Sequence, residues 1–128
     1  MARILVIDDE EPIRSLMKRA LERQGHQVEE APDGSVGIRL FGESRFDLVI
    51  TDLLMPEKEG IETLLDLKEL DPDVKTLVVS GGLSFRGRAL DKYGPLEDAE
   101  ALGADATLSK PFEIRELVDA VAELLGDS

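Results

Sequence analysis

Short apolar runs recur along this chain, and each is bounded by polar or turn-forming residues. Runs of about four to eight apolar residues are typical of buried strands. Five segments qualify as strands, over residues 3–7, 27–30, 46–51, 74–80 and 106–109. The segment 46–51 is the clearest of them, because it is too continuously apolar for a strand with one face in water.

The segments between these strands repeat apolar residues at helical spacing. The first predicted helix covers residues 11–24, with Pro12 in its first turn, where a missing N–H does no harm, and Gly25 at its end. Further helices are predicted after Asp33, over residues 60–70, near 96–102 and over 114–125, where the apolar stripe is broadest.

Strands and helices thus alternate along the whole sequence. Such alternation predicts right-handed crossovers and a parallel sheet covered by helices on both faces, which is an α/β fold. A length of 128 residues suits one domain of this kind. We therefore expect a single domain over residues 1–128, with no effector domain in this chain.

Composition narrows the functional classes. The net charge of −13 argues against a nucleic-acid partner, which would require a basic face. The absence of cysteine excludes disulfides and thiolate metal sites. The sequence has no apolar stretch near the ~18 residues of a membrane span and no basic-then-apolar leader, so it predicts a cytoplasmic protein that does not contact the membrane.

Charged residues stand at the ends of three predicted strands. Asp8 and Asp9 follow the first strand, Asp52 follows the third, and Lys110 follows the fifth. Because parallel strands end at one edge of a sheet, where open α/β sheets bind their ligands, these side chains should share a crevice. Carboxylates bind Mg²⁺, an aspartate can form an acyl-phosphate, and an ammonium group can neutralise a phosphoryl group. The pattern therefore indicates phosphoryl chemistry beside a metal ion.

The same residues belong to a wider series of short motifs. In order, these are Asp8-Asp9-Glu10, Asp52-Leu53-Leu54-Met55-Pro56 with Gly60, Ser80-Gly81-Gly82, Gly103-Ala104-Asp105 and Lys110-Pro111-Phe112. Each motif alone has little specificity. Together, in this order and at these strand ends, they give a chain that resembles the receiver domains of two-component response regulators over essentially its whole length. The resemblance implies a flavodoxin-like doubly wound sheet of five parallel strands, in the order 2-1-3-4-5, with five helices.

The resemblance also implies how the acidic residues act. Asp52 would be the phosphoacceptor, which receives a phosphoryl group from a histidine kinase or a histidine phosphotransfer protein. Asp9, Asp52 and the backbone carbonyl of Leu54 would bind Mg²⁺ or Mn²⁺ directly, and Asp8 would bind it through water. Taken alone, Asp8 and Asp9 could equally be acidic loop residues without a ligand.

Three more residues receive a role from the same resemblance. Ser80 would be the switch hydroxyl that moves toward the phosphoryl oxygen, and Lys110 would be the phosphate-binding ammonium. The bond between Lys110 and Pro111 would be cis, which only a following proline makes accessible. The simpler alternatives are a turn serine before two glycines and a solvated surface lysine.

Two features depart from the family pattern. Thr107 stands where family members often carry Tyr or Phe, and it cannot bury the ~150–250 Å² of an aromatic ring that turns inward on switching. The chain between Ser80 and Lys110 is longer than is usual in the family, and the excess lies in residues 81–95. This basic and aromatic segment either packs as a surface loop or helix extension or forms an atypical partner surface, with Tyr93 replacing the missing ring.

Three functions remain open on this basis. The first is a receiver that switches partner binding when phosphorylated, a signalling protein whose phosphotransfer and dephosphorylation act only on itself. The second is a constitutive interaction module with the same fold, suggested by Thr107 and the segment 81–95. The third is a Mg²⁺-dependent phosphohydrolase of small phosphate esters. It ranks last because haloacid dehalogenase-type enzymes usually carry a second Asp where this chain has Leu54.

Overall fold

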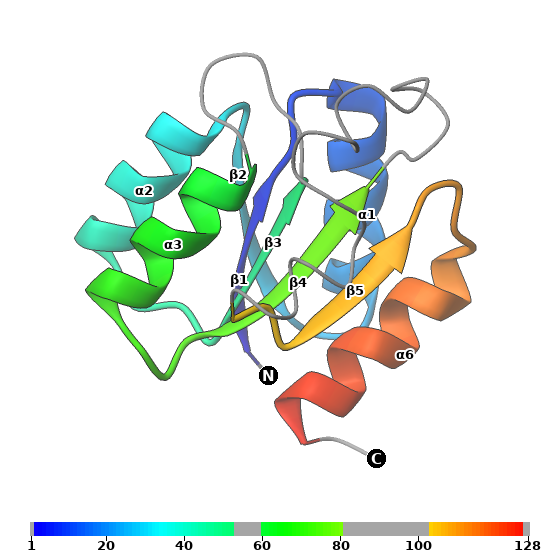
Figure 1. Cartoon of the computed structure of the whole chain (residues 1–128). Coiled ribbons are helices and arrows are strands. Elements are labelled where there is room, and N and C mark those ends of the chain that lie inside the picture. Colours follow the sequence, from blue (N-terminus) through cyan, green and yellow to red (C-terminus); the bar gives the residue numbers. More distant parts are fainter. Residues whose placement is uncertain (1, 53–59, 81–102, 127–128) are drawn as a thin grey trace.

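The chain forms a parallel sheet with helices on both faces (Figure 1). The computed structural model describes residues 2–52, 60–80 and 103–126. The strands are β1 (Arg3–Ile7), β2 (Gln27–Ala31), β3 (Leu48–Asp52), β4 (Lys75–Ser80) and β5 (Ala106–Ser109). The helices in these ranges are α1 (Glu11–Arg23), α2 (Gly34–Glu43), α3 (Gly60–Leu70) and α6 (Ile114–Leu125). The helix predicted near 96–102 and the segment 81–95 lie outside the described residues.

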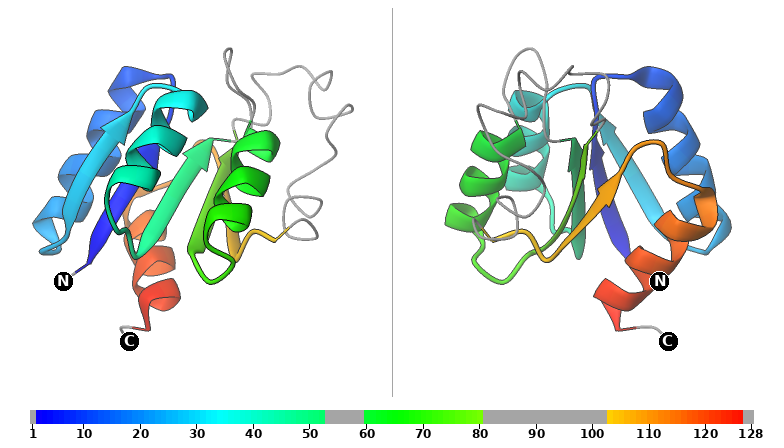
Figure 2. Two further views of the ribbon diagram at one scale, coloured as in Figure 1. Left: turned by 90° about the vertical axis from the view of Figure 1, so that its left-hand side faces the viewer. Right: turned by 45° about the vertical axis from the view of Figure 1, so that its right-hand side comes forward.

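The strand order is β2-β1-β3-β4-β5, and every neighbouring pair is parallel. This order confirms the predicted flavodoxin-like fold. Helices α1 and α6 cover one face of the sheet, and α2 and α3 cover the other, as the two further views in Figure 2 show. No helix within the described ranges is long and apolar enough to cross a membrane.

Strand β1 supplies side chains to both halves of the core. Ile4 and Val6 point into the cluster beneath α1 and α6, whereas Leu5 and Ile7 point into the cluster beneath α2 and α3. This alternation follows from the two-residue period of a strand. Because all four side chains are fully buried, the end of β1 is held firmly where the chain enters the acidic loop.

Strands β2, β3 and β4 differ from their predicted bounds by one or two residues, and the largest difference is at the start of β3. The apolar run begins at Phe46, but β3 begins at Leu48. The ring of Phe46 stacks on Phe41 with centroids 6.2 Å apart. Asp47 donates its N–H to the carbonyl oxygen of Arg3, and its Oδ2 accepts the N–H of Arg3. The apolar residue at position 46 therefore reflects packing under α2 and does not mark the start of the strand.

Local signals fix the helix that follows the fifth strand. Helix α6 opens with a side-chain contact of the capping-box kind, in which the carboxylate of Glu116 accepts the N–H of Glu113 over 2.8 Å. It ends at Gly126, whose φ of 81° is accessible to glycine at little cost. The short connection before this helix carries Lys110 back toward the sheet edge.

Candidate functional site

The sheet register brings the predicted site residues to one edge. Asp52 is the last residue of β3 and pairs with Val79 of β4. Ser80 ends β4 and pairs with Ser109 of β5, directly before Lys110. On the other side of β3, the last pair with β1 joins Thr51 to Ile7, so that Asp8 emerges beside Asp52.

The ammonium of Lys110 is the centre of the site. Its Nζ lies 2.8 Å from Oδ2 of Asp52, 3.0 Å from Oδ2 of Asp8 and 3.1 Å from Oε1 of Glu10. The exposed side-chain fractions are 8% for Lys110, 0% for Asp8 and 3% for Asp52, against 56% for Glu10. Burial alone would lower the pKa of Lys110, but the charges and hydrogen bonds of Asp52 and Asp8 outweigh it and raise that pKa well above its ordinary value.

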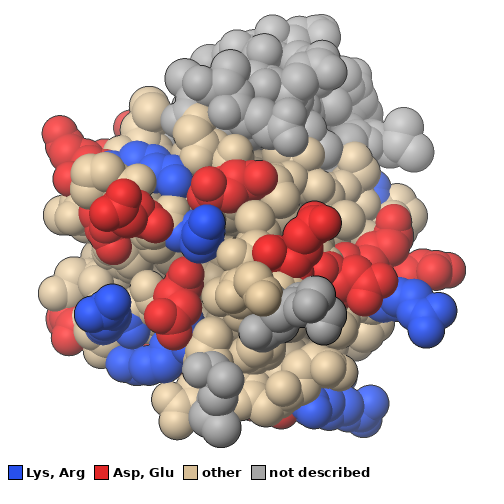
Figure 3. Space-filling view, turned by 90° about the horizontal axis from the view of Figure 1, so that it is seen from below, with Lys and Arg blue, Asp and Glu red and all other residues tan. Residues whose placement is uncertain are grey.

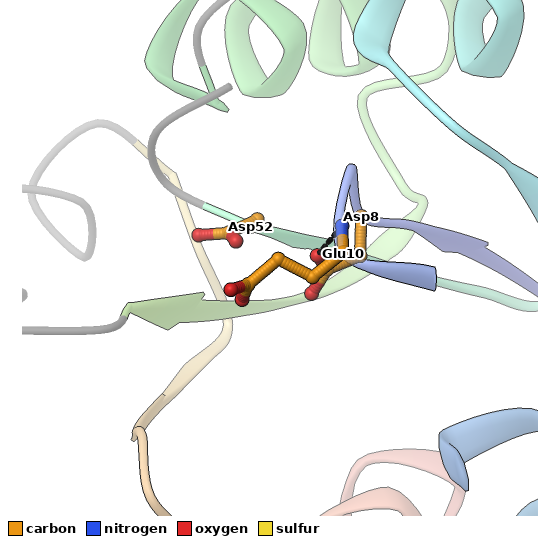
Figure 4. A group of neighbouring side chains, drawn as sticks. All are labelled: Asp8, Glu10 and Asp52. Carbon is orange, nitrogen blue, oxygen red and sulfur yellow. Dashed lines mark hydrogen bonds between the residues drawn. The ribbon is translucent and has the colours of Figure 1, made fainter. Parts of the chain in front are cut away.

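Asp8 is held by backbone as well as by side-chain contacts. Its N–H donates to the carbonyl oxygen of Ala31, at the end of β2, over 3.1 Å. Its Oδ1 accepts the N–H of Glu10 over 2.9 Å, which closes the loop into an Asx turn (Figure 4). This turn directs the Glu10 side chain toward the site.

Three carboxylates converge at the edge of the sheet. Asp8, Glu10 and Asp52 each offer an oxygen, and these oxygens lie within 4.8 Å of one another (Figure 4). Lys110 compensates only one of the three negative charges. The donors are all hard oxygens, which suit Mg²⁺ or Mn²⁺, so the residues present fit a divalent cation. At the opposite edge, by contrast, acidic and basic side chains are intermixed (Figure 3).

Asp9 is next to this cluster but is not part of it. Its side chain is exposed, and the three grouped carboxylates include Glu10 instead. Partial burial, reinforced by the charge of Asp8, raises the pKa of the Asp9 carboxyl. An added cation would oppose the part of this shift that comes from the charges of the neighbouring carboxylates.

The structure thus brings together three of the predicted residues and adds one. Asp8, Asp52 and Lys110 meet as expected, whereas the sequence reasoning gave Glu10 no role. Its signal was its position two residues after Asp8, where an Asx turn returns the chain to the site. The carbonyl of Leu54 and the side chain of Ser80 lie outside what the structure describes.

The two remaining predicted positions lie on and after β5. Thr107 is half-buried within the strand and pairs with Val78 of β4. The peptide bond between Lys110 and Pro111 is cis. Both belong to the connection that places the ammonium group at the sheet edge.

Comparisons with known proteins agree with this geometry. The family model described as the response regulator receiver domain matches residues 4–122. The response regulator receiver protein CpdR of Brucella abortus is 34% identical over 125 residues, with 98% of each chain covered. The transcriptional regulatory protein CpxR of Escherichia coli is 40% identical over 128 residues, but this chain spans 51% of its length.

A solved structure extends the comparison to the fold. The response regulator protein TrrA of Thermotoga maritima, crystallised with Mg²⁺ and BeF, superposes with a TM-score of 0.81 at 32% identity. That alignment covers 98% of this chain and 100% of the other. The family match decides against the phosphohydrolase alternative. The chain belongs to the receiver domains of two-component response regulators and is a phosphoacceptor of that family.

Proposed function

We propose that Asp52 is the residue that accepts the phosphoryl group, from a histidine kinase or a histidine phosphotransfer protein. The observation that supports this role is the contact between the buried Asp52 carboxylate and Lys110, 2.8 Å apart, beside two further carboxylates. Asp52 ends a strand at the edge of the sheet where open α/β sheets bind their ligands. A phosphoryl donor would approach from this edge.

The reaction requires few groups from the protein. An Oδ oxygen of Asp52 forms a bond to phosphorus while the P–N bond of the phosphohistidine breaks. The imidazole leaves with the electron pair of that bond. Lys110 neutralises charge on the phosphoryl oxygens as this exchange proceeds. In the separate step of dephosphorylation, water attacks phosphorus, the bond to Asp52 breaks and inorganic phosphate leaves, so turnover is confined to the chain itself.

The acidic loop would hold the metal ion. We assign Asp9, Asp52 and the carbonyl of Leu54 as direct ligands, and Asp8 as a ligand through water. Glu10, which is grouped with Asp8 and Asp52, adds a fourth carboxylate to this set. When bound, Mg²⁺ or Mn²⁺ neutralises phosphoryl charge. The magnesium complex of TrrA supports this assignment through its similarity to the chain.

Output from the site would pass through the end of β4. Ser80 would donate its hydroxyl to the phosphoryl oxygen and thereby report phosphorylation to the segment that follows it. Thr107 lies on the neighbouring strand and has no ring to move, so the segment 81–95 would supply the partner surface instead. We place this signalling in the cytoplasm, where the kinase domains that phosphorylate receivers act.

A mass measurement tests the proposal. The protein is incubated with acetyl phosphate and Mg²⁺, and a phosphoryl adduct is expected in the wild type and absent in Asp52→Asn. The matched control is Asp119→Asn, an exposed position on α6, which should keep the adduct. An adduct that persists in Asp52→Asn would contradict the assignment. A wild type that gives neither an adduct nor a beryllofluoride-induced spectral change would favour the constitutive module.

A further inference from the structure

Arg14 of α1 connects the acidic loop to the end of β2. Its Nη1 donates to the backbone carbonyl of Asp8 over 2.8 Å, and its Nε donates to Oε1 of Glu30 over 2.9 Å. The side chain is only 14% exposed, so this double contact is protected from water. The planar fork of a guanidinium can satisfy both acceptors at once, which a lysine ammonium cannot do with the same geometry.

The bonded carbonyl determines the direction of the next residue. The carbonyl of Asp8 belongs to the planar peptide group that joins Asp8 to Asp9. A donor that fixes this oxygen therefore fixes the plane from which the Asp9 side chain leaves. The preceding peptide is held as well, because the Asp8 N–H donates to Ala31. Both peptide groups around Asp8 are thus tied to the end of β2, one directly and one through Arg14.

We propose that Arg14 is a positioning residue for the divalent cation. It acts through the backbone of Asp8 and presents Asp8 and Asp9 to the ion in the geometry that binding requires. This role rests on the proposed function, in which those two carboxylates hold Mg²⁺. It goes beyond that function because Arg14 is neither a ligand nor a phosphate contact.

Electrostatics and positioning predict opposite effects when Arg14 is replaced. A guanidinium repels a dication, so the loss of its charge alone would tighten Mg²⁺ binding. Loss of the hold on the Asp8 carbonyl would weaken binding, because ordering the loop would then cost part of the binding free energy. The direction of the change in affinity therefore separates the two effects.

The experiment is a Mg²⁺ titration of the whole chain, followed by the amide resonances of the acidic loop. We expect Arg14→Gln to weaken Mg²⁺ binding about tenfold, in the range that outer contacts of metal ligands usually contribute. Arg14→Lys keeps the charge and loses the fork, so it should also bind more weakly than the wild type. Added Mg²⁺ at saturating concentration should restore the rate of phosphorylation by acetyl phosphate in both variants.

The matched control is Arg3→Gln. Arg3 pairs with Glu29 across the same two strands, but at the end of β1 that is remote from the site. It should leave Mg²⁺ affinity unchanged. If Arg14→Gln does not fold, Glu30→Met removes the acceptor that anchors the guanidinium while Arg14 stays in place, and a smaller weakening is expected there.

The outcomes separate this inference from the proposed function. A wild type that binds no Mg²⁺ would contradict the metal site and the role of Arg14 together. A wild type that binds Mg²⁺, with an Arg14→Gln variant that binds equally or more tightly, would overturn only the role of Arg14. Wild-type affinity in Arg14→Lys with weakened affinity in Arg14→Gln would show that a single ammonium donor is sufficient, and it would overturn the requirement for the guanidinium fork.

Discussion

The ammonium of Lys110 lies 2.8 Å from Oδ2 of Asp52, and this contact joins the ends of β5 and β3 across the intervening β4. The cation that would balance phosphoryl charge therefore already touches the acceptor before any donor arrives. It also occupies space within a cluster that would bind a metal ion. Lys110 should consequently speed phosphorylation of Asp52 and compete with the metal ion for the carboxylates.

These two effects predict a split phenotype for Lys110→Met. Phosphorylation by acetyl phosphate should slow by about 10²–10³, the usual cost of losing one donor that stabilises developing charge. Mg²⁺ affinity should rise, because each of the three carboxylates loses an ammonium partner that competes with the metal ion. Adduct formation over time and a Mg²⁺ titration measure the two effects separately.

The control for this variant is Lys75→Met, at the exposed start of β4 on the opposite edge. It removes the same charge and should change neither property. Weakened Mg²⁺ binding in Lys110→Met would show that the ammonium supports the metal site instead of competing with it.

Much of the fold follows from the spacing of apolar residues. The end-to-end alternation of short strands with amphipathic helices was enough to predict a parallel sheet and the edge at which Asp8, Asp52 and Lys110 meet. Phe46 misled the prediction of one boundary because an apolar residue can bury itself beside a strand as well as within it. Periodicity alone does not distinguish these two environments.

The composition of the carboxylate cluster was harder to predict. Asp8 and Asp9 are adjacent, and nothing in their residue type says which side chain turns inward. The Asx turn closed by Glu10 decides this, and it depends on a hydrogen bond of backbone to side chain over two residues. The role of Arg14 was likewise hidden, because its partner is a carbonyl group that every residue carries.

Stability should depend on Asp105 in a pH-dependent manner. Its Oδ2 accepts the N–H of Thr76 over 2.8 Å and the ammonium of Lys68 over 3.1 Å. Partial burial would raise the pKa of Asp105, but these contacts outweigh it and hold that pKa below its ordinary value. A carboxyl whose folded pKa is lowered stabilises the fold above its unfolded pKa of about 3.9, and this contribution is lost as pH falls through the folded value.

Asp105→Asn should therefore lower the free energy of unfolding by about 1 kcal/mol at pH 7, a modest value because the pair is partly exposed. The difference from the wild type should shrink toward zero as pH falls below about 3.9. Urea denaturation at several pH values measures it. A difference that is the same at all pH values would show that Asp105 acts by packing and neutral hydrogen bonds.

Helix α2 should tolerate no side chain at Gly37. A Cβ built there would lie 2.3 Å from Cδ1 and 2.8 Å from Cγ1 of Ile7, whose side chain is fully buried. Gly37→Ala should destabilise the protein by about 1–3 kcal/mol through overpacking at the residue directly before Asp8. Gly42→Ala in the same helix meets no atom within 4 Å and should stabilise by roughly 0.5–1 kcal/mol through helix propensity. Equal effects of the two substitutions on the urea midpoint would contradict this close packing.

Thr63 of α3 should be a site at which an apolar substitution stabilises the protein. Its hydroxyl is buried and has no hydrogen-bond partner in the described structure, so folding removes it from water without compensation. Thr63→Val keeps the shape of the side chain and should raise the free energy of unfolding by about 1 kcal/mol. Thr76→Val is the matched comparison, because that buried hydroxyl exchanges hydrogen bonds with Asp105, and its loss should destabilise by a similar amount. Chemical denaturation of both variants measures the change in the free energy of unfolding, and we expect opposite signs. A loss of stability in both variants would show that the Thr63 hydroxyl has a hydrogen-bond partner.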